Sequence, residues 1–122
     1  MYQARWRRAN KYGNRKVTVF GITFDSKREA LRYMELVSMQ RAGKITDLQT
    51  QVPYELIPAM RDDDGRLIQR GCSYVADFVY KAVNLDGSTT EVVEDAKGCR
   101  TEVYKLKKKL MYWRHGILIR EV

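Results

Sequence analysis

The stretch SYVADFVYKAVNLDGSTTEVVEDAK, residues 73–97, decides the fold of this 122-residue chain. Residues 73–83 and 89–97 are rich in Val, Tyr and Thr, and they flank the turn sequence NLDGS. This pattern predicts two antiparallel strands joined by a tight turn. The second strand carries Glu94, Asp95 and Lys97 among residues that should be buried. Because unpaired charge is costly to bury, these residues mark either an exposed edge or a functional site.

The length of the turn decides which acidic residues share a face of this hairpin. In a three-residue loop that ends at a left-handed Gly87, Asp77 lies opposite Asp95. Lys97 then projects on the same face, while Glu94 points to the other. A two-residue turn would shift the register by one position and bring Glu94 to Asp77 instead. We favour the longer loop, because it places the lysine with two acids.

Two carboxylates opposed on neighbouring strands repel each other, and a divalent cation would relieve that repulsion. Oxygen ligands of this kind suit Mg²⁺ or Mn²⁺, which take one or two carboxylates along with waters and a substrate phosphate. A metal there would activate a water and neutralise charge on the phosphate, while Lys97 positions the water or stabilises the developing anion. The hairpin therefore predicts hydrolysis of a phosphodiester, with Asp77, Asp95 and Lys97 as catalytic residues.

A helix is predicted on the N-terminal side of this hairpin. It follows a small hairpin at residues 17–24, begins at a capping box formed by Ser26 and Glu29, and ends at Gly43. The apolar stripe expected to face the core is Ala30, Leu31, Met34 and Val37. Residues 45–58 then read as a strand that Pro53 interrupts. The acidic sequence after it, RDDDGR, lacks the glutamate of a calcium loop and is predicted to be a solvated turn.

A second helix is predicted at residues 101–115, ending at Gly116. Its expected apolar face is Val103, Leu106, Leu110 and Trp113. The closing sequence GILIREV reads as a strand. Strands separated by a helix are normally parallel neighbours through a right-handed crossover, so this strand should lie beside residues 90–97.

The charge of the chain indicates a polyanionic partner. Its 23 Lys and Arg against 15 Asp and Glu give a net charge of +8 and a pI near 9.6, which favours nucleic acid over an anionic membrane surface. No apolar run is long enough for a spanning helix, and no export signal is evident, so we expect a cytoplasmic protein with no membrane partner. Residues 17–122 should form one domain.

Basic residues are concentrated in two places. Residues 1–16 read as a flexible basic arm, either a solvated tail or a segment that grips phosphates and stacks its aromatic residues on bases. The cations of the arm are Arg5, Arg7, Arg8, Lys11, Arg15 and Lys16. The second predicted helix adds Lys105, Lys108 and Lys109 as candidate nucleic-acid contacts.

The order helix, three strands, helix, strand, with an Asp on the second strand and Asp-Ala-Lys on the third, resembles the PD-(D/E)XK, or restriction-endonuclease-like, superfamily. Asp77 matches its first motif acid, Asp95 its second and Lys97 its lysine, while Ala76 stands where the motif name has Pro. The stretches KYGNRK, FDSKREA, YVADFVY, VEDAKG and YKLKKKLMYWRHGI resemble small phage-encoded proteins of that superfamily. The resemblance implies an α/β fold with a mixed central sheet flanked by helices.

The resemblance also suggests further site residues. Many such nucleases carry a third acid on the first helix, which makes Glu29 a candidate catalytic residue and metal ligand as well as a helix cap. Gln51 loosely matches a polar residue that some relatives place near the metal, although an ordinary strand-end side chain explains it too. Alternation makes Glu94 a residue behind the ligands or a solvent-facing one, unless a bulge turns it toward the metal.

The activity that the resemblance implies is Mg²⁺-dependent cleavage of DNA. Small phage nucleases of this superfamily include Holliday junction resolvases that serve recombination and replication, so we expect a homodimer that cuts branched DNA in the cytoplasm of a bacterial host. A two-fold axis would place two metal sites for symmetric cleavage of a junction. The alternative is a non-catalytic nucleic-acid-binding protein that uses the same basic surface.

Overall fold

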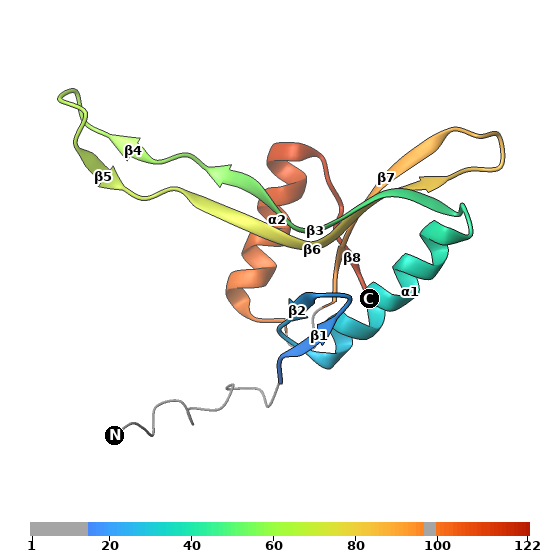
Figure 1. The fold of residues 1–122 in the computed structure, drawn as a ribbon. Helices are drawn as coiled ribbons and strands as arrows, with labels where there is room; N and C mark the ends of the chain where they lie inside the picture. Colours follow the sequence, from blue (N-terminus) through green and yellow to red (C-terminus); the bar gives the residue numbers. More distant parts are fainter. Residues whose placement is uncertain (1–14, 97–99) are drawn as a thin grey trace, which may run out of the picture.

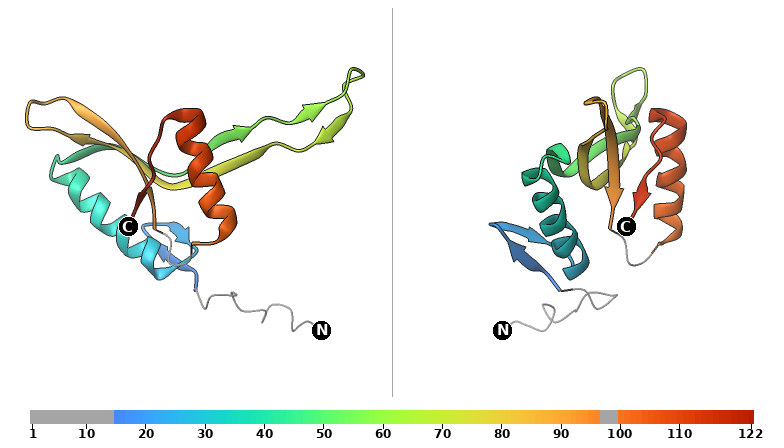
Figure 2. Two further views of the ribbon diagram at one scale, coloured as in Figure 1. Left: turned by 180° about the vertical axis from the view of Figure 1, so that it is seen from behind. Right: turned by 90° about the vertical axis from the view of Figure 1, so that its right-hand side faces the viewer.

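The computed structural model describes residues 15–96 and 100–122. A four-stranded sheet in the order β3-β6-β7-β8 forms its centre (Figure 1). The helices α1 and α2 cover opposite faces of this sheet, as the right-hand view of Figure 2 shows. The sheet is mixed, because β3, β6 and β7 are antiparallel and β8 runs parallel to β7. The elements are α1 (Lys27–Arg41), β3 (Ile45–Ile57), β6 (Cys72–Val83), β7 (Thr89–Asp95), α2 (Glu102–His115) and β8 (Arg120–Glu121). The predicted α/β class and element order are therefore confirmed.

The hairpin of β6 and β7 has the register that the three-residue loop predicts. Gly87 has a left-handed φ of 87°, and its N–H donates to the Asn84 carbonyl over 3.0 Å. The Asn84 N–H in turn donates to the Ser88 carbonyl over 2.8 Å and closes the loop. The ladder continues to the pair of Phe78 and Glu94. Asp77 and Asp95 are the next residues beyond that pair, on adjacent strands.

Pro53 does not interrupt β3, which is a correction to the sequence prediction. The strand runs through it, and Pro53 pairs with Val75 of β6. Proline is tolerated because β3 is an edge strand, whose outer N–H groups have no ladder to join. Beyond β3 the chain projects from the body as a two-stranded ribbon of β4 (Met60–Arg61) and β5 (Leu67–Gln69) (Figure 1). The acidic turn at its tip is exposed, as predicted.

The helix α1 begins and ends where its capping signals predict, but its buried face is different. Ser26 caps its N-terminus by accepting a hydrogen bond from the Glu29 N–H over 3.2 Å, and Gly43 follows its C-cap with a φ of 79°. Ala30 and Leu36 are the fully buried residues, whereas Leu31 and Met34 of the expected stripe are exposed. The helix is turned so that Arg32 also faces the sheet.

The face of α2 was predicted wrongly. Its ends are as expected, with Thr101 capping the Tyr104 N–H and a left-handed Gly116 at the C-terminus. The fully buried residues are Tyr104 and Met111, neither of which belongs to the predicted stripe, and Leu110 of that stripe is partly buried against the core. Three members of that stripe are exposed to solvent, at 63% for Val103, 57% for Leu106 and 78% for Trp113.

The inner face of α2 uses side chains that the pattern scored as polar. The Tyr104 hydroxyl donates to a Glu121 carboxylate oxygen over 2.7 Å, so its ring can be buried while its polar end is satisfied. The Lys108 ammonium reaches the same carboxylate at 3.1 Å and leaves its stem half-buried against the sheet. A stripe chosen by hydrophobicity alone therefore missed Tyr104 and Lys108.

The apolar interior consists of two clusters, one on each side of the sheet. The α2 side is built around Leu56, Val79, Val93 and Met111, and the α1 side around Phe24, Leu36, Phe78 and Tyr80. A small hairpin of β1 (Val17–Val19) and β2 (Ile22–Phe24) extends the α1 cluster. No helix in residues 15–96 and 100–122 is long and apolar enough to cross a membrane.

A pair of substitutions in α2 tests which face is buried. Met111→Ala should lower the free energy of unfolding by about 2–5 kcal/mol, because it empties a fully buried position. Leu106→Ala should change it by about 0.5 kcal/mol or less, because that side chain is already exposed. Urea denaturation measures both, and equal losses would contradict the orientation of α2.

Candidate active site at the end of the central hairpin

Asp77 and Asp95 lie together where β6 and β7 leave their ladder. The Asp77 Oδ2 atom accepts a hydrogen bond from the Ala96 N–H over 2.9 Å, which ties the acid on β6 to the residue that follows Asp95. Asp95 is completely buried, and Asp77 is 8% exposed. The structure thus brings the two predicted acids into one buried position.

Tyr74 is the residue at this position that sequence reasoning missed. Its hydroxyl donates to the Asp95 Oδ2 atom over 2.5 Å. Burial raises the pKa of the Tyr74 hydroxyl, and so do its hydrogen bond to Asp95 and the negative charges of Asp95 and Asp77. The phenol therefore stays protonated and acts as a fixed donor to Asp95. Its only sequence signal was its place in the strand that also contains Asp77.

The acid pair fits a hard divalent cation. Two carboxylates on one face of a strand pair are the kind of oxygen donors that Mg²⁺ or Mn²⁺ takes, with waters and a phosphate completing the coordination. Within residues 15–96 and 100–122, no third Asp, Glu, His or Cys joins them in a metal-binding group. Lys97, the predicted catalytic lysine, lies outside the described residues.

The other candidates lie around this position. Glu29 is half-buried in the first turn of α1, where its backbone N–H is bonded to the Ser26 cap. Its role as a metal ligand stays a prediction. Gln51 lies on β3 between residues that pair with the neighbours of Asp77, and it has a left-handed φ of 53°. A left-handed non-glycine residue stores about 1–3 kcal/mol of strain, and such strain clusters at functional sites.

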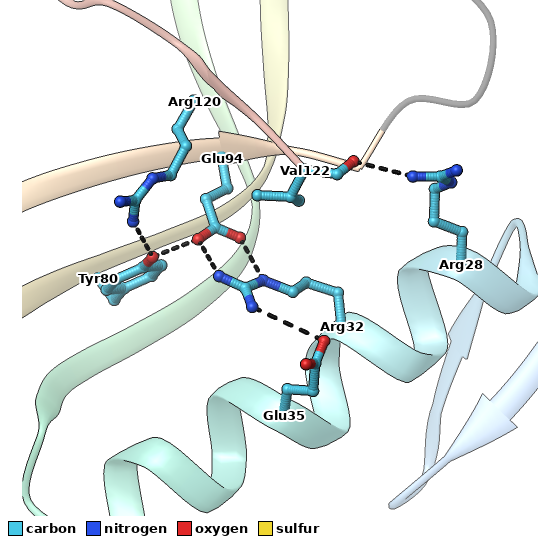
Figure 3. Close-up of polar contacts among 7 residues, drawn as sticks. All are labelled: Arg28, Arg32, Glu35, Tyr80, Glu94, Arg120 and Val122. Atoms are coloured by element: carbon cyan, nitrogen blue, oxygen red, sulfur yellow. Dashed lines mark hydrogen bonds and ion pairs between the residues drawn. The ribbon is translucent and has the colours of Figure 1, made fainter.

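Glu94 does not face solvent, so the predicted alternative of a solvent-facing side chain is wrong. It is completely buried on the α1 side of the sheet, where Arg32 binds it with both arms of its guanidinium (Figure 3). Arg32 Nε donates to Glu94 Oε1 over 2.9 Å, and Arg32 Nη2 donates to Glu94 Oε2 over 2.6 Å. The hydrogen bonds to Glu94 raise the pKa of Arg32 further above its usual value.

The Glu94 carboxylate has a second donor from its own sheet. The Tyr80 hydroxyl donates to Glu94 Oε2, and Arg120 of β8 donates to the same hydroxyl over 3.4 Å (Figure 3). Burial and Glu94 raise the pKa of Tyr80, so its hydroxyl remains a donor. Arg32 lies in none of the stretches that carry the resemblance, and Tyr80 ends one of them, YVADFVY, without matching a motif residue. The signal was the charge of Glu94 itself, which needed a donor once it was buried.

The lysines of α2 are partly neutralised. They line a shallow cavity of about 470 Å³ together with Arg100, but two acids lie among them. Lys105 forms an ion pair with Glu102 at 3.0 Å, and Lys108 forms one with Glu121 at 3.1 Å. Lys109 is exposed. As nucleic-acid contacts, these lysines stay a prediction.

Only the end of the basic arm is described. Arg15 and Lys16 are exposed immediately before β1. Arg5, Arg7, Arg8 and Lys11 lie outside the described residues, so their role stays a prediction as well.

Fold and site together define an α/β protein with a mixed four-stranded sheet between two helices and a buried acid pair at one end of the central hairpin. The chain belongs to the family described as "Protein of unknown function (DUF1064)", whose sequence model matches residues 9–120. No curated protein and no solved structure matches it.

The buried ion pair can be tested through stability. Arg32→Met should lower the free energy of unfolding by about 3–5 kcal/mol, because it leaves the Glu94 charge buried without its main partner. Arg28→Met, one turn earlier on the same helix and exposed, is the matched control and should change it by about 0.5 kcal/mol or less. Equal effects of the two substitutions in urea denaturation would show that the pair does not hold α1 to the sheet.

Proposed function

We propose that the protein is a metal-dependent DNA endonuclease with a restriction-endonuclease-like core. The observation that carries the proposal is the buried pair of Asp77 and Asp95 at the point where β6 and β7 diverge. Like charges placed together in an interior are unfavourable, and a bound Mg²⁺ would compensate both. The order α1, β3, β6, β7, α2, β8 supports the proposal, since it is the order that the resemblance implies.

The residues of the chain have separate roles in this proposal. Asp77 and Asp95 would hold the metal, and a bound metal would supply a nucleophilic water and neutralise charge on the phosphate. The Ala96 N–H bonds one carboxylate oxygen of Asp77, and the Tyr74 hydroxyl bonds one carboxylate oxygen of Asp95. Each hydrogen bond fixes the orientation of the second oxygen of the same carboxylate. Lys97, two residues after Asp95 in the sequence, would position the attacking water or stabilise the developing anion.

The rival function is nucleic-acid binding without cleavage. The basic composition supports it equally well, because a net charge of +8 attracts any polyanion. It gives no reason for two buried, adjacent carboxylates. Titration with Mn²⁺ separates the two functions, since only the nuclease needs a metal at those acids.

Substitution of the predicted catalytic residues is the direct test. Asp77→Asn, Asp95→Asn and Lys97→Ala should each abolish Mg²⁺-dependent cleavage of DNA. The two acid variants should be as stable as the wild type or more so without metal, because each removes a repulsion. Asp63→Asn in the exposed turn is a control that should cleave normally. Wild-type rates in any of the three site variants would refute the assignment of that residue.

Glu29 needs a substitution that separates its two possible roles. In Glu29→Gln the amide still serves a capping box, but it is a poorer metal ligand than a carboxylate. We expect cleavage to fall by about ten-fold or more while the melting temperature is unchanged. Unchanged cleavage would leave Glu29 as a helix cap only.

Substrate preference and assembly form the last part of the proposal. We expect a homodimer that cuts a four-way junction faster than a linear duplex of the same sequence, because symmetric cleavage of a junction needs two sites related by a two-fold axis. Analytical ultracentrifugation measures the assembly, and cleavage of a panel of branched and linear DNAs in Mg²⁺ measures the preference. A monomer at working concentration, or equal rates on both substrates, would contradict it.

A further inference from the structure

A cavity of about 440 Å³ lies between the N-terminal half of α1 and the end of β7. Its lining is mainly cationic on the helix side, and Ala96 and Val122 close the opposite side. The cations are Lys27, Arg28 and Arg32, with Leu31 between them. The acid Glu35 also lines the cavity, where it is exposed and its carboxylate lies 3.7 Å from the Arg32 guanidinium.

Two arginines of this cavity are held in place by the protein (Figure 3). Arg32 lines one side of the cavity, and two hydrogen bonds to the buried Glu94 carboxylate hold its guanidinium there. Arg28 lies one turn earlier, and its Nη1 donates to the Val122 carbonyl over 3.2 Å. A guanidinium held in this way loses little conformational entropy when it binds an anion.

The charge at this cavity differs from that of the α2 lysines. Neither Lys27 nor Arg28 forms an ion pair with an acidic side chain among the described residues, whereas Lys105 and Lys108 each have one. Lys27 and Arg28 are also the first two residues of α1. Cations at a helix N-terminus oppose the helix dipole by about 0.3–1 kcal/mol each, and a bound anion would reverse that effect. The interaction of these two cations with the helix dipole is therefore unfavourable without a ligand, and a bound anion would make it favourable.

Ala96 connects this cavity to the acid pair. Its N–H is bonded to Asp77, it follows Asp95 in the chain, and it also lines the cavity. The cavity and the acid pair therefore have Ala96 as a common neighbour. Leu31 and Ala96 add an apolar surface beside the cations, which suits a sugar ring more than a free hydrated phosphate.

We propose that this cavity binds a backbone phosphate of the nucleic-acid strand that also passes Asp77 and Asp95, with Lys27 and Arg28 as its donors and Arg32, whose charge Glu94 and Glu35 compensate, as a fixed wall of the site. This inference rests on the proposed function and adds to it the path of the strand, which runs along the N-terminal turns of α1.

The test is the salt dependence of DNA binding, measured without divalent metal so that cleavage plays no part. The double variant Lys27→Ala/Arg28→Ala is compared with wild type by fluorescence anisotropy of a labelled duplex over a series of NaCl concentrations. Each lost phosphate contact lowers the slope of log K against log salt by about 0.9, so the double variant should lose about 1.8. Its melting temperature should be unchanged or higher, because two unfavourable charges leave the helix N-terminus.

The matched control removes two exposed cations from the projecting ribbon, Arg66→Ala/Arg70→Ala. This variant should keep the wild-type slope. An unchanged slope in Lys27→Ala/Arg28→Ala, or an equal loss in both double variants, would overturn the proposal. So would competition by inorganic phosphate that exceeds the effect of chloride at the same ionic strength, because the cavity would then prefer a free anion.

The same experiment separates this inference from the proposed function. If wild-type protein cleaves DNA in Mg²⁺ and the Lys27→Ala/Arg28→Ala variant binds with an unchanged slope, the strand path is wrong and the nuclease proposal stands. If wild-type protein neither binds nor cleaves nucleic acid, the proposed function fails and this inference fails with it.

Discussion

Glu94 is a completely buried carboxylate at the centre of the sheet, and the α1 side of the molecule is arranged around its neutralisation. Arg32 must face inward to reach it, and this sets the rotation of α1 and leaves Leu31 and Met34 exposed. The same rotation points Arg28, one turn earlier, at the end of the chain. A buried ion pair adds little net stability compared with apolar residues, but removing one partner is costly, so it specifies one orientation of the helix.

The sequence was sufficient for the parts of the fold that short-range chemistry determines. The turn sequence allowed two loop lengths, and the three-residue loop that was favoured is the one found, with the register that brings Asp77 beside Asp95. Helix ends followed from Ser26 and Gly116 for the same reason, since a cap is a contact between near neighbours in the chain. Helix faces were harder to predict. Tyr104 on α2 and Arg32 on α1 are buried through polar partners far along the chain, and no pattern of aliphatic residues contains that information.

The same distinction applies to the candidate site. The two acids were predictable because one hairpin carries both of them. Tyr74, which donates to Asp95, lies near Asp77 in the stretch YVADFVY but is 21 residues from Asp95 in the sequence. Long-range donors of this kind are found by asking which buried carboxylate still needs a partner, and the answer requires the packed structure. Glu94, Asp95 and Lys97 therefore do not share one role: Glu94 stabilises the fold, and Asp95 belongs to the candidate site.

Electrostatics connects the acid pair with the cations of α1. A nucleic-acid strand that approaches Asp77 and Asp95 meets two negative charges, so a nuclease of this design needs positive charge nearby that no protein acid already neutralises. The lysines of α2 meet this need poorly, because Glu102 and Glu121 bind two of them. Lys27 and Arg28 meet it better, since they have no acidic side-chain partner within residues 15–96 and 100–122 and line a cavity that Ala96, the residue bonded to Asp77, also lines. In the proposed function, attraction of the strand to Lys27 and Arg28 offsets its repulsion by Asp77 and Asp95, and this favours approach of the strand along α1.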